Sequence, residues 1–391
     1  MSADKSVVGI VGTGFTARGL ARALRRSDEF TPGPVLTRRR EAHIPGFDDG
    51  EITVSPDDLI ERSGIIVECS GDPLYATDVI ERAVAAGRRV VTMSAAWHVT
   101  AGSHYHGRGY ITEAEGDQPG SLAALAEDSR AMGFEPLVYV NVKRFLNHTP
   151  TFDEMSHFSK LYGISLPQVV SFTDGTKLQL EQALVANGFG ADILRQGMIG
   201  PAPPRIEDGL EVLARAAHEH GSPIVDYVLT GEASGAVMIL ARHDAQEAAA
   251  LQWFKMGDGP LYRMVRPYHL CHLEILKTLR RAAAGGPVLL DNGARPTISV
   301  AAVAKHTIRA GERIEQGIGS FCVRGECVRM REHPGHLPIA LLQSAVLTRD
   351  IDAGGMIMLD DVEIPDSAAL KAWRAVEPAT LSDGVCTCRP A

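Results

Sequence analysis

Apolar and polar residues follow two alternating patterns over the first hundred residues. Short apolar runs, typical of parallel strands that are buried on both faces, recur along this segment. They occupy residues 7–11, 34–37, 64–68 and 89–94. Between them, residues 17–24 and 76–86 place apolar side chains at helical spacing, and arginines are available for the wet side of the first helix. The pattern predicts strands and helices in alternation around a parallel sheet.

Later segments have a different texture. A strand is expected over residues 137–141, a helix over residues 176–185 and a further helix that ends near Ala284. From Pro296 onward short strands and turns replace the helices. We therefore predict an α/β fold with an N-terminal Rossmann domain, an α+β central domain and a small, mostly-β C-terminal module. A chain of 391 residues is long enough for roughly two or three such units.

A glycine turn follows the first apolar run directly, with Gly12, Gly14 and Ala17 in the spacing GxGxxA. Gly12 permits the tight turn, Gly14 lets the backbone approach a pyrophosphate, and small Ala17 brings the helix close to the strand. The helix N-terminus then faces the anion. The motif alone is a weak signal, but its position between a buried strand and an amphipathic helix makes it strong. We expect a dinucleotide to bind here.

The second predicted strand ends at Arg38, Arg39 and Arg40, where an NAD-specific protein places an acidic residue. Guanidinium groups pair with a 2′-phosphate, so NADPH/NADP is favoured over NAD(H). A solvated basic turn is the alternative interpretation. The turn after the fourth strand and the end of the next strand complete the expected cofactor site. Its residues are Gly12, Gly14, Phe15, Thr16, Arg38, Arg39, Cys69, Ser70, Gly71 and Ser94.

Composition and charge limit the classes of partner. The chain is 45% hydrophobic and 22% charged, and no apolar run is long enough for a membrane span. A net charge of -9 argues against a nucleic-acid surface, so a small-molecule substrate is expected. The first residues run into a strand without a hydrophobic signal core, which favours a cytoplasmic protein. Six scattered cysteines are too sparse for a disulfide scaffold, and we interpret them as reduced structural thiols.

Five further segments carry a family resemblance. They are Glu115-Gly116-Asp117-Gln118-Pro119-Gly120, Phe172-Thr173-Asp174-Gly175-Thr176-Lys177, and residues 131–135, 185–188 and 266–270. Together with the N-terminal unit and the C-terminal part, they resemble the SAF-domain oxidoreductases that are distant relatives of homoserine dehydrogenase. That group includes the enzymes similar to 1-deoxy-D-xylulose 5-phosphate reductoisomerase. The resemblance covers nearly the whole chain and is specific to the group rather than to one reaction.

We expect three domains, a flexible tail and an assembly. Residues 1–145 would bind NADP, residues 146–295 would bind substrate, carry catalysis and dimerise, residues 296–375 would form a SAF-like module, and residues 376–391 a flexible tail. A homodimer or higher homo-oligomer is expected because the family is oligomeric. The SAF-like module contains no convincing catalytic set, so we expect it to act as a lid or in dimer packing.

The resemblance also ranks the candidate catalytic residues as Lys177, Lys143, Asp174 and Glu181. Asp174 would lie at or near a helix N-cap, and Lys177 and Glu181 one turn apart would share a face. Hydride transfer needs a proton donor or acceptor at the substrate oxygen, and a partly buried lysine with a lowered pKa could serve. The alternative is an N-cap aspartate beside a surface ion pair. Lys143 would be a proton relay or a substrate anchor.

The expected substrate-binding residues are Gln118, Asn187, Arg266, Tyr268 and His269. Arg266 could hold a carboxylate or phosphate bidentately, while Tyr268 and His269 could complete the pocket. Glu115 and Asp117 could help to hold a divalent cation, Mg or Mn, although loop acids are also good turn formers. The metal ligands therefore stay unassigned.

Departures from the family pattern bear on the reaction. After the fifth strand the chain lacks the lysine of homoserine dehydrogenases, and Ala96 and His98 stand where the reductoisomerase-like relatives more often carry acids. The leading hypothesis is an NADP(H)-dependent oxidoreductase, reductoisomerase-like, that acts on a small polyhydroxylated or phosphorylated keto or hydroxy substrate. The alternatives are a simple polyol or hydroxy-acid dehydrogenase and a non-catalytic NADPH-binding regulatory protein.

Overall fold

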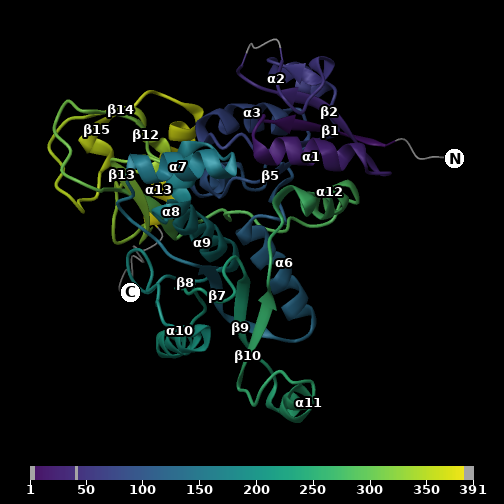
Figure 1. Ribbon diagram of the computed structural model, residues 1–391, viewed down its shortest axis with the longest axis vertical. Helices are drawn as coiled ribbons and strands as arrows, with labels where there is room; N and C mark the ends of the chain where they lie inside the picture. The colour runs from purple at the N-terminus through teal and green to yellow at the C-terminus, as the bar shows by residue number, and fades with distance from the viewer. Residues whose placement is uncertain (1–4, 40–42, 383–391) are drawn as a thin grey trace, which may run out of the picture.

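The computed structural model describes residues 5–39 and 43–382. Its upper part in Figure 1 contains a parallel sheet in the order β3-β2-β1-β4-β5-β6. The strands are β1 (Ser6–Val11), β2 (Phe30–Leu36), β3 (Ile52–Thr53), β4 (Ile65–Glu68), β5 (Arg89–Thr92) and β6 (Ile111–Glu113). The strand order switches between β1 and β4, because β2 and β3 are added on one side of β1 and β4, β5 and β6 on the other. Ligands bind at the carboxyl ends of strands beside such a switch point.

Helices cover both faces of this sheet. They are α1 (Phe15–Arg25), α2 (Pro56–Glu61), α3 (Pro73–Ala85) and α12 (Ile275–Ala283), with the short turns η1 (Asp49–Glu51) and η4 (Cys271–Leu273). Leu20 and Leu24 of α1 pack with Ile275 and Leu279 of α12 on one face. Val79 and Ile80 of α3 are buried on the other face. The predicted helix near Ala284 is therefore part of the first layer, although it lies far along the chain.

A second sheet lies below the first and has the order β10-β9-β7-β8. Its strands are β7 (Glu135–Lys143), β8 (Ile224–Leu229), β9 (Val237–Arg242) and β10 (Leu261–Arg266). Helices α6 (Gln118–Ala131) and α10 (Ile206–His220) accompany it, and η3 (Ala245–Glu247) and α11 (Ala248–Trp253) form its lower tip in Figure 1. Because β7 pairs with β8 and β9, the first sheet ends before the expected boundary at residue 145.

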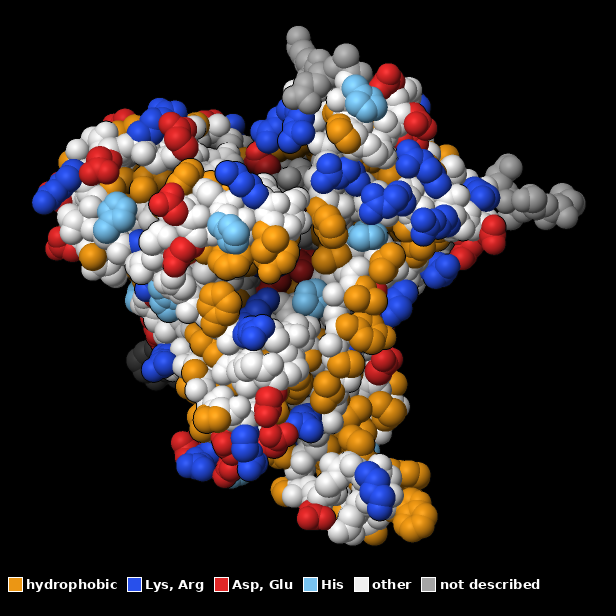
Figure 2. Space-filling view, in the orientation of Figure 1, with side chains coloured by type: hydrophobic (Ala, Val, Ile, Leu, Met, Phe, Trp, Pro, Cys, Tyr) orange, Lys and Arg blue, Asp and Glu red, His pale blue; other side chains and the backbone are white. Residues whose placement is uncertain are grey.

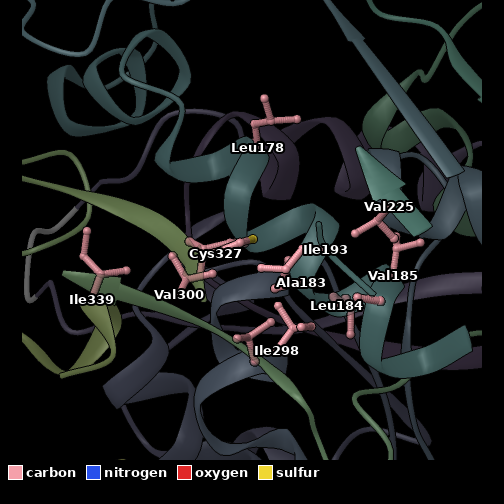
Figure 3. Packing of buried hydrophobic residues seen from close by; sticks show 14 of the residues in the cluster. Leu178, Ala183, Leu184, Val185, Ile193, Val225, Ile298, Val300, Cys327 and Ile339 are labelled. Atoms are coloured by element: carbon pink, nitrogen blue, oxygen red, sulfur yellow. The ribbon is translucent and has the colours of Figure 1, made fainter. Parts of the chain in front are cut away.

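Helix α9 (Thr176–Phe189) crosses the middle of the molecule between the second sheet and the C-terminal part. Leu178, Leu184 and Val185 belong to one large apolar cluster with Val225 of β8 and Ile298 (Figure 3). Burial on every side explains why α9 has only a weak apolar stripe. The short elements α4 (Ala95–Trp97), η2 (His98–Gly102), α5 (Ser103–Tyr105), α7 (Phe152–Tyr162) and α8 (Leu166–Thr173) complete this region.

The C-terminal part forms two small antiparallel sheets, β11-β13 and β12-β14-β15. The elements are β11 (Ile298–Ala304), β12 (Arg313–Gln316), β13 (Val323–Arg329), η5 (Ile339–Leu341), β14 (Gln343–Leu347), η6 (Leu359–Asp361), β15 (Val362–Glu363) and α13 (Ala368–Ser382). The expected mixed α/β class, with a Rossmann-like parallel sheet and smaller sheets beyond it, is confirmed. Below, residues 296–366 are called the C-terminal module.

The flexible tail expected from residue 376 is wrong for its first seven residues, because α13 continues to Ser382. Buried Trp373 and Ala372 anchor this helix, and Ala372 packs in the same cluster as Val79 of α3. The pair Cys386 and Cys388 lies outside the described residues. Within residues 5–39 and 43–382, no helix is long and apolar enough to cross a membrane.

Candidate active site

The glycine turn between β1 and α1 has the geometry that a pyrophosphate requires. Gly12 has φ 109°, and a Cβ at this position would lie 2.8 Å from the Cα of Ser70 and 2.9 Å from the carbonyl oxygen of Cys69. Gly14 caps α1, and a Cβ there would meet no atom within 4 Å. The first residues of α1 also line an open cleft at the positive end of the helix, which suits a phosphate. The residues present fit a dinucleotide.

A cleft of about 470 Å³ runs from this turn along the carboxyl ends of β1, β2 and β4. Nine of the ten expected cofactor residues line it, and the tenth, Ser94, lines an adjoining cavity. Arg40 lies outside the described residues. The structure thus gathers the expected cofactor set at one edge of the parallel sheet, as the topological rule requires.

Arg38 lies at the outer end of the cleft. Its Nη2 is 2.7 Å from Oδ2 of Asp72, and its guanidinium carbon lies 4.6 Å from the centre of the Tyr75 ring. The side chain is 64% exposed, and exposed Arg39 follows it. The ion pair and the ring contact hold one face of the guanidinium while leaving the group accessible to a ligand.

The adjoining cavity has a volume of about 250 Å³ and opens from the inner end of the cleft. Both spaces share seven lining residues: Phe15, Thr16, Cys69, Gly71, Gln168, Ser171 and Ile318. The inner cavity adds Asp117, Lys177 and Glu181. A dinucleotide laid along the cleft would therefore have its inner end beside these three charged side chains. Figure 2 shows a hollow at this level, with acidic side chains deep in it and apolar ones around it.

Lys177 is held by two carboxylates. Its Nζ donates to both oxygens of Asp117, at 2.8 and 2.9 Å, and lies 3.2 Å from Oε1 of Glu181. Lys143 approaches the other oxygen of Glu181 at 3.5 Å, and Asn141 donates to that oxygen at 3.0 Å. Glu181 therefore lies between the two lysines. Three of the four expected catalytic residues come together in this way.

The protonation of Lys177 differs from the expectation. Burial opposes the charged form, but the carboxylates of Asp117 and Glu181 outweigh it and raise the pKa of Lys177 above its ordinary value. Burial also works against ionised Asp117, yet Lys177 keeps the pKa of that carboxyl below its usual range. The expected lowered lysine pKa is wrong. With a side chain 32% exposed, Lys177 is a charged donor that reaches the cavity.

Gln118, an expected substrate-binding residue, belongs to the same cluster. It begins α6, is 1% exposed, and accepts a hydrogen bond from Lys143. Its Nε2 is buried and has no hydrogen-bond partner among the described residues. Gln118 thus fixes Lys143 in place and keeps a spare donor close to the two lysines.

Asp174, the fourth expected catalytic residue, lies in neither cavity. Its carboxylate accepts from the backbone N–H of Thr176 and pairs with Nζ of Lys305, each at 2.8 Å. Gly175, with φ 89°, takes the N-cap position instead. Asp174 is buried and joins the start of α9 to β11, so its catalytic assignment is corrected to a structural one.

Arg266 is likewise not available for a substrate. It is only 13% exposed, donates twice to Oε2 of Glu115 at 3.0 and 3.1 Å, and also donates to Glu274. Lys277 reaches the same Glu115 oxygen at 3.0 Å. The expected anion-binding arginine is therefore neutralised by two carboxylates. Glu115 is 151 positions away in the sequence, and Glu274 lies directly before α12.

The remaining expected substrate residues also lie elsewhere. Asn187 bonds Asn292 and the backbone of Thr297 and Ile298, and so joins the end of α9 to the start of β11. Tyr268 is 51% exposed, and Nδ1 of His269 lies 2.8 Å from the carbonyl oxygen of Gly235. Neither ring lines the inner cavity, although His269 is close enough to lower the pKa of Asp117.

The expected divalent cation does not fit the residues present. The two carboxylates that were expected to share a metal ion instead pair with different basic side chains. Glu115 pairs with Arg266 and Lys277, whereas Asp117 pairs with Lys177. Within the described ranges no group of three or more His, Cys, Asp or Glu side chains could hold a metal ion.

Sequence reasoning missed a row of buried polar residues beneath the site. Glu68, Thr92 and Glu113 are register neighbours at the ends of β4, β5 and β6. Glu113 is fully buried, and its carboxylate, which has no hydrogen-bond partner among the described residues, lies 3.5 Å from Nε2 of His98. Burial raises the pKa of Glu113 well above its usual value and lowers that of His98 to about 4. A polar residue at the end of each apolar run was the available signal.

Comparisons with known proteins give a family match over the middle of the chain. Residues 116–275 match the family model of the catalytic domain of oxidoreductase DRL. This segment of the chain includes Asp117, Lys143, Lys177 and Glu181. On this match the protein is an oxidoreductase enzyme. None of the curated proteins matches the sequence at a significant level.

Solved structures show partial similarity to the chain. A Sinorhizobium meliloti 1021 protein assigned as a myo-inositol dehydrogenase is 12% identical, with 73% of this chain and 91% of that chain covered and a TM-score of 0.39. UDP-N-acetylglucosamine 3-dehydrogenase from Acidithiobacillus ferrooxidans is 13% identical, with 74% and 93% covered and a TM-score of 0.38. Biliverdin reductase from Synechocystis sp. PCC 6803, in complex with biliverdin and NADP+, is 17% identical, with 40% and 58% covered and a TM-score of 0.28.

Proposed function

We propose that the protein is an NADP(H)-dependent oxidoreductase that interconverts a carbonyl and an alcohol on a small, uncharged polar substrate. One observation carries the proposal: the dinucleotide cleft opens at its inner end into a cavity that Lys177 lines. The outer end of the same cleft carries Arg38 and Arg39, which suit a 2′-phosphate. A bound NADP(H) would therefore have arginines beside its 2′-phosphate and Lys177 beside its nicotinamide.

The roles of the side chains follow from their contacts. NADPH supplies a hydride when bound, and the reduced carbonyl oxygen must then receive one proton. Lys177 is held in the charged form by Asp117 and Glu181, so it hydrogen-bonds the carbonyl oxygen and donates that proton. Lys143, on the other oxygen of Glu181, stabilises the carboxylate while Lys177 is neutral. In alcohol oxidation the same groups act in reverse.

The charge of the site favours an uncharged substrate over a phosphorylated one. Asp117 and Glu181 are balanced by Lys177 and Lys143. Arg266, the expected phosphate anchor, is already paired with Glu115 and Glu274. A phosphate in the inner cavity would need an unpaired cation or a free helix N-terminus. A polyhydroxylated keto or hydroxy compound needs only hydrogen-bonding partners.

Plain hydride transfer is favoured over reductoisomerisation. Skeletal rearrangement with chelation of adjacent oxygens needs a divalent ion, and the carboxylates expected to hold it are paired with lysines and an arginine. The resemblance to reductoisomerase-like enzymes keeps the rearrangement as the second candidate. The two reactions differ in the carbon skeleton of the product.

The test is a screen of NADPH oxidation with linear and branched keto-sugars, with and without magnesium or manganese, and of NADP+ reduction with polyols. We expect turnover of an uncharged substrate without added metal, a product with an unrearranged skeleton, and loss of turnover in Lys177→Ala. Lys371→Ala, at an exposed lysine of α13, is the matched control. NADPH binding without any turnover would instead support a regulatory protein, and a rearranged product would support the reductoisomerase.

We also propose a homodimer, formed through the lower arm of the molecule. Trp253 is 78% and Phe254 69% exposed at the tip, and Val265 of edge strand β10 is 40% exposed. Figure 2 shows apolar side chains gathered along this arm, over β10 and α11. Large exposed apolar surfaces of this kind are typical of association sites. Light scattering should give the mass of a dimer for the wild type and of a monomer for Trp253→Ser/Phe254→Ser.

A further inference from the structure

We propose that the C-terminal module forms the second wall of the dinucleotide cleft, with Ile318 and Gln343 in direct contact with the bound cofactor. The proposal rests on the NADP(H) site proposed above. The first wall is the glycine turn and the strand ends of the parallel sheet. Opposite it, the cleft is lined by residues 316–318, by Ala340, Leu342 and Gln343, and by four residues of the α8 region. Residues about 300 positions apart in the sequence thus enclose one space.

The second wall is fixed by close backbone packing. Gly319 has φ 77°, and a Cβ there would lie 2.2 Å from the carbonyl oxygen of Pro167 at the start of α8. A Cβ on Gly317 would lie 2.2 Å from the carbonyl oxygen of Ile339 in η5. Residues 316–319 are therefore pressed between two neighbouring backbones. Ile318, between the two glycines, lines both the outer cleft and the inner cavity, at the level where they join.

Gln343 connects the module to the first wall. Its Nε2 donates to Oδ1 of Asp72 at 3.4 Å, and Oδ2 of the same carboxylate holds Arg38 at 2.7 Å. Ser344, the next residue, has φ 50°, a conformation that is unfavourable for a residue with a side chain. Such strain persists where the surrounding structure imposes it, and it is frequent at ligand sites. The strained position directly follows a residue that lines the cleft.

The chemistry of this wall indicates what it contacts. The lining residues of the module are a pair of glutamines, a glycine and apolar side chains, without a charge. They therefore suit the ribose and nicotinamide parts of a dinucleotide, whereas the phosphates are served by α1 and the arginines. This assignment predicts that the wall strengthens binding of NADPH and NADH alike, because the two cofactors differ only in the 2′-phosphate.

Two variants test the wall directly by binding rather than turnover. Ile318→Ala and Gln343→Ala should each raise the Kd for NADPH by about 5- to 30-fold, from lost apolar area or one lost amide contact. The Kd for NADH should rise by a similar factor in Ile318→Ala, and it should also rise in Gln343→Ala, although Asp72, the partner of Gln343, additionally holds Arg38. Fluorescence titration of the full-length protein measures both constants, and thermal unfolding shows whether each variant stays folded.

Ile364→Ala is the matched control, because Ile364 is a half-buried isoleucine of the same module that lines neither cavity. Its Kd values should equal those of the wild type. If Ile318→Ala and Gln343→Ala bind NADPH as tightly as Ile364→Ala, the wall does not contact the cofactor, and the proposal is overturned while the NADP(H) site stands. If the wild type binds neither NADPH nor NADH, both proposals fail together.

Discussion

The double substitution Arg38→Asp/Arg39→Ala should reverse the preference of this protein between the two nicotinamide cofactors. Both arginines line the outer end of the dinucleotide cleft, and Arg38 is pre-positioned by Asp72 and Tyr75. Loss of the guanidinium groups removes the partners of a 2′-phosphate. The new aspartate repels that phosphate and can accept from the ribose hydroxyls of NADH instead.

The size of the effect follows from the exposure of the site. A hydrogen bond to a charged group contributes about 1.5–3 kcal/mol, and solvent screening at a side chain that is 64% exposed reduces this to about 1 kcal/mol for each arginine. Repulsion between the aspartate and a phosphate of charge about -2 adds roughly 1–2 kcal/mol in water. The sum of about 3–4 kcal/mol corresponds to a change of about 10²- to 10³-fold in the ratio of the two Kd values.

Fluorescence titration with NADPH and NADH measures this ratio at low salt, where surface charges act most strongly. Arg89→Asp is the matched control, since Arg89 is exposed at the start of β5, on the opposite edge of the same sheet. The control should leave the ratio unchanged. If the double variant binds both cofactors with the wild-type ratio, the assignment of the arginines to a 2′-phosphate is refuted.

Three other perturbations separate the chemistry of the site from its support. Asp117→Asn should lower the pKa of Lys177, because it removes one of the two carboxylates that raise it. Carbonyl reduction needs the protonated lysine, so the kcat of the variant should fall at alkaline pH, whereas the kcat of the wild type should not. Glu113→Gln should become more stable relative to the wild type as the pH of urea unfolding rises from about 5 to about 8. The raised pKa of Glu113 makes the folded wild type lose stability above the pKa of about 4.3 that the carboxyl has in the unfolded chain, and glutamine does not titrate. An identical pH dependence of the two proteins would contradict a buried, protonated carboxyl. Asn187→Ala should reduce the free energy of unfolding by about 2–4 kcal/mol through its lost hydrogen bonds, with an unchanged Kd for NADPH, and a specific loss of substrate binding would restore its expected role.

Local patterns in the sequence were sufficient for four of the six strands of the first sheet, namely β1, β2, β4 and β5, and for the expectation that the cofactor residues lie at one edge of it. The strand at residues 7–11, the glycine turn and the helix after it depend on neighbours within about one turn or one strand, and periodicity reports such neighbours. The cofactor residues could be found together because the carboxyl ends of parallel strands meet at one edge. Strand β7 could be predicted as a strand, but the sheet to which it belongs could not. Its partners β8 and β9 follow many residues later, and a local pattern does not indicate which strands pair.

The substrate residues show the same limit at the level of single side chains. Arg266 and Asp174 are polar residues in segments that resemble a family, and from sequence each could bind a ligand. The structure pairs Arg266 with Glu115 and Asp174 with Lys305, more than a hundred positions away in each case. A buried charge has to be paired, and its partner decides whether it is available to a substrate. That partner is a property of the tertiary fold.

Lys177 shows that a residue can be found from sequence while its chemical role is not. From sequence only Glu181, one helical turn away, is visible as a neighbour, and a partly buried lysine with one such neighbour could be a base with a lowered pKa. Asp117 arrives from the start of α6, sixty positions earlier, and accepts two hydrogen bonds from the same ammonium group. The second carboxylate raises the pKa of Lys177 against the effect of burial. The lysine is therefore kept in the charged form that can hydrogen-bond a carbonyl oxygen, and this protonation state depends on one contact that only folding creates.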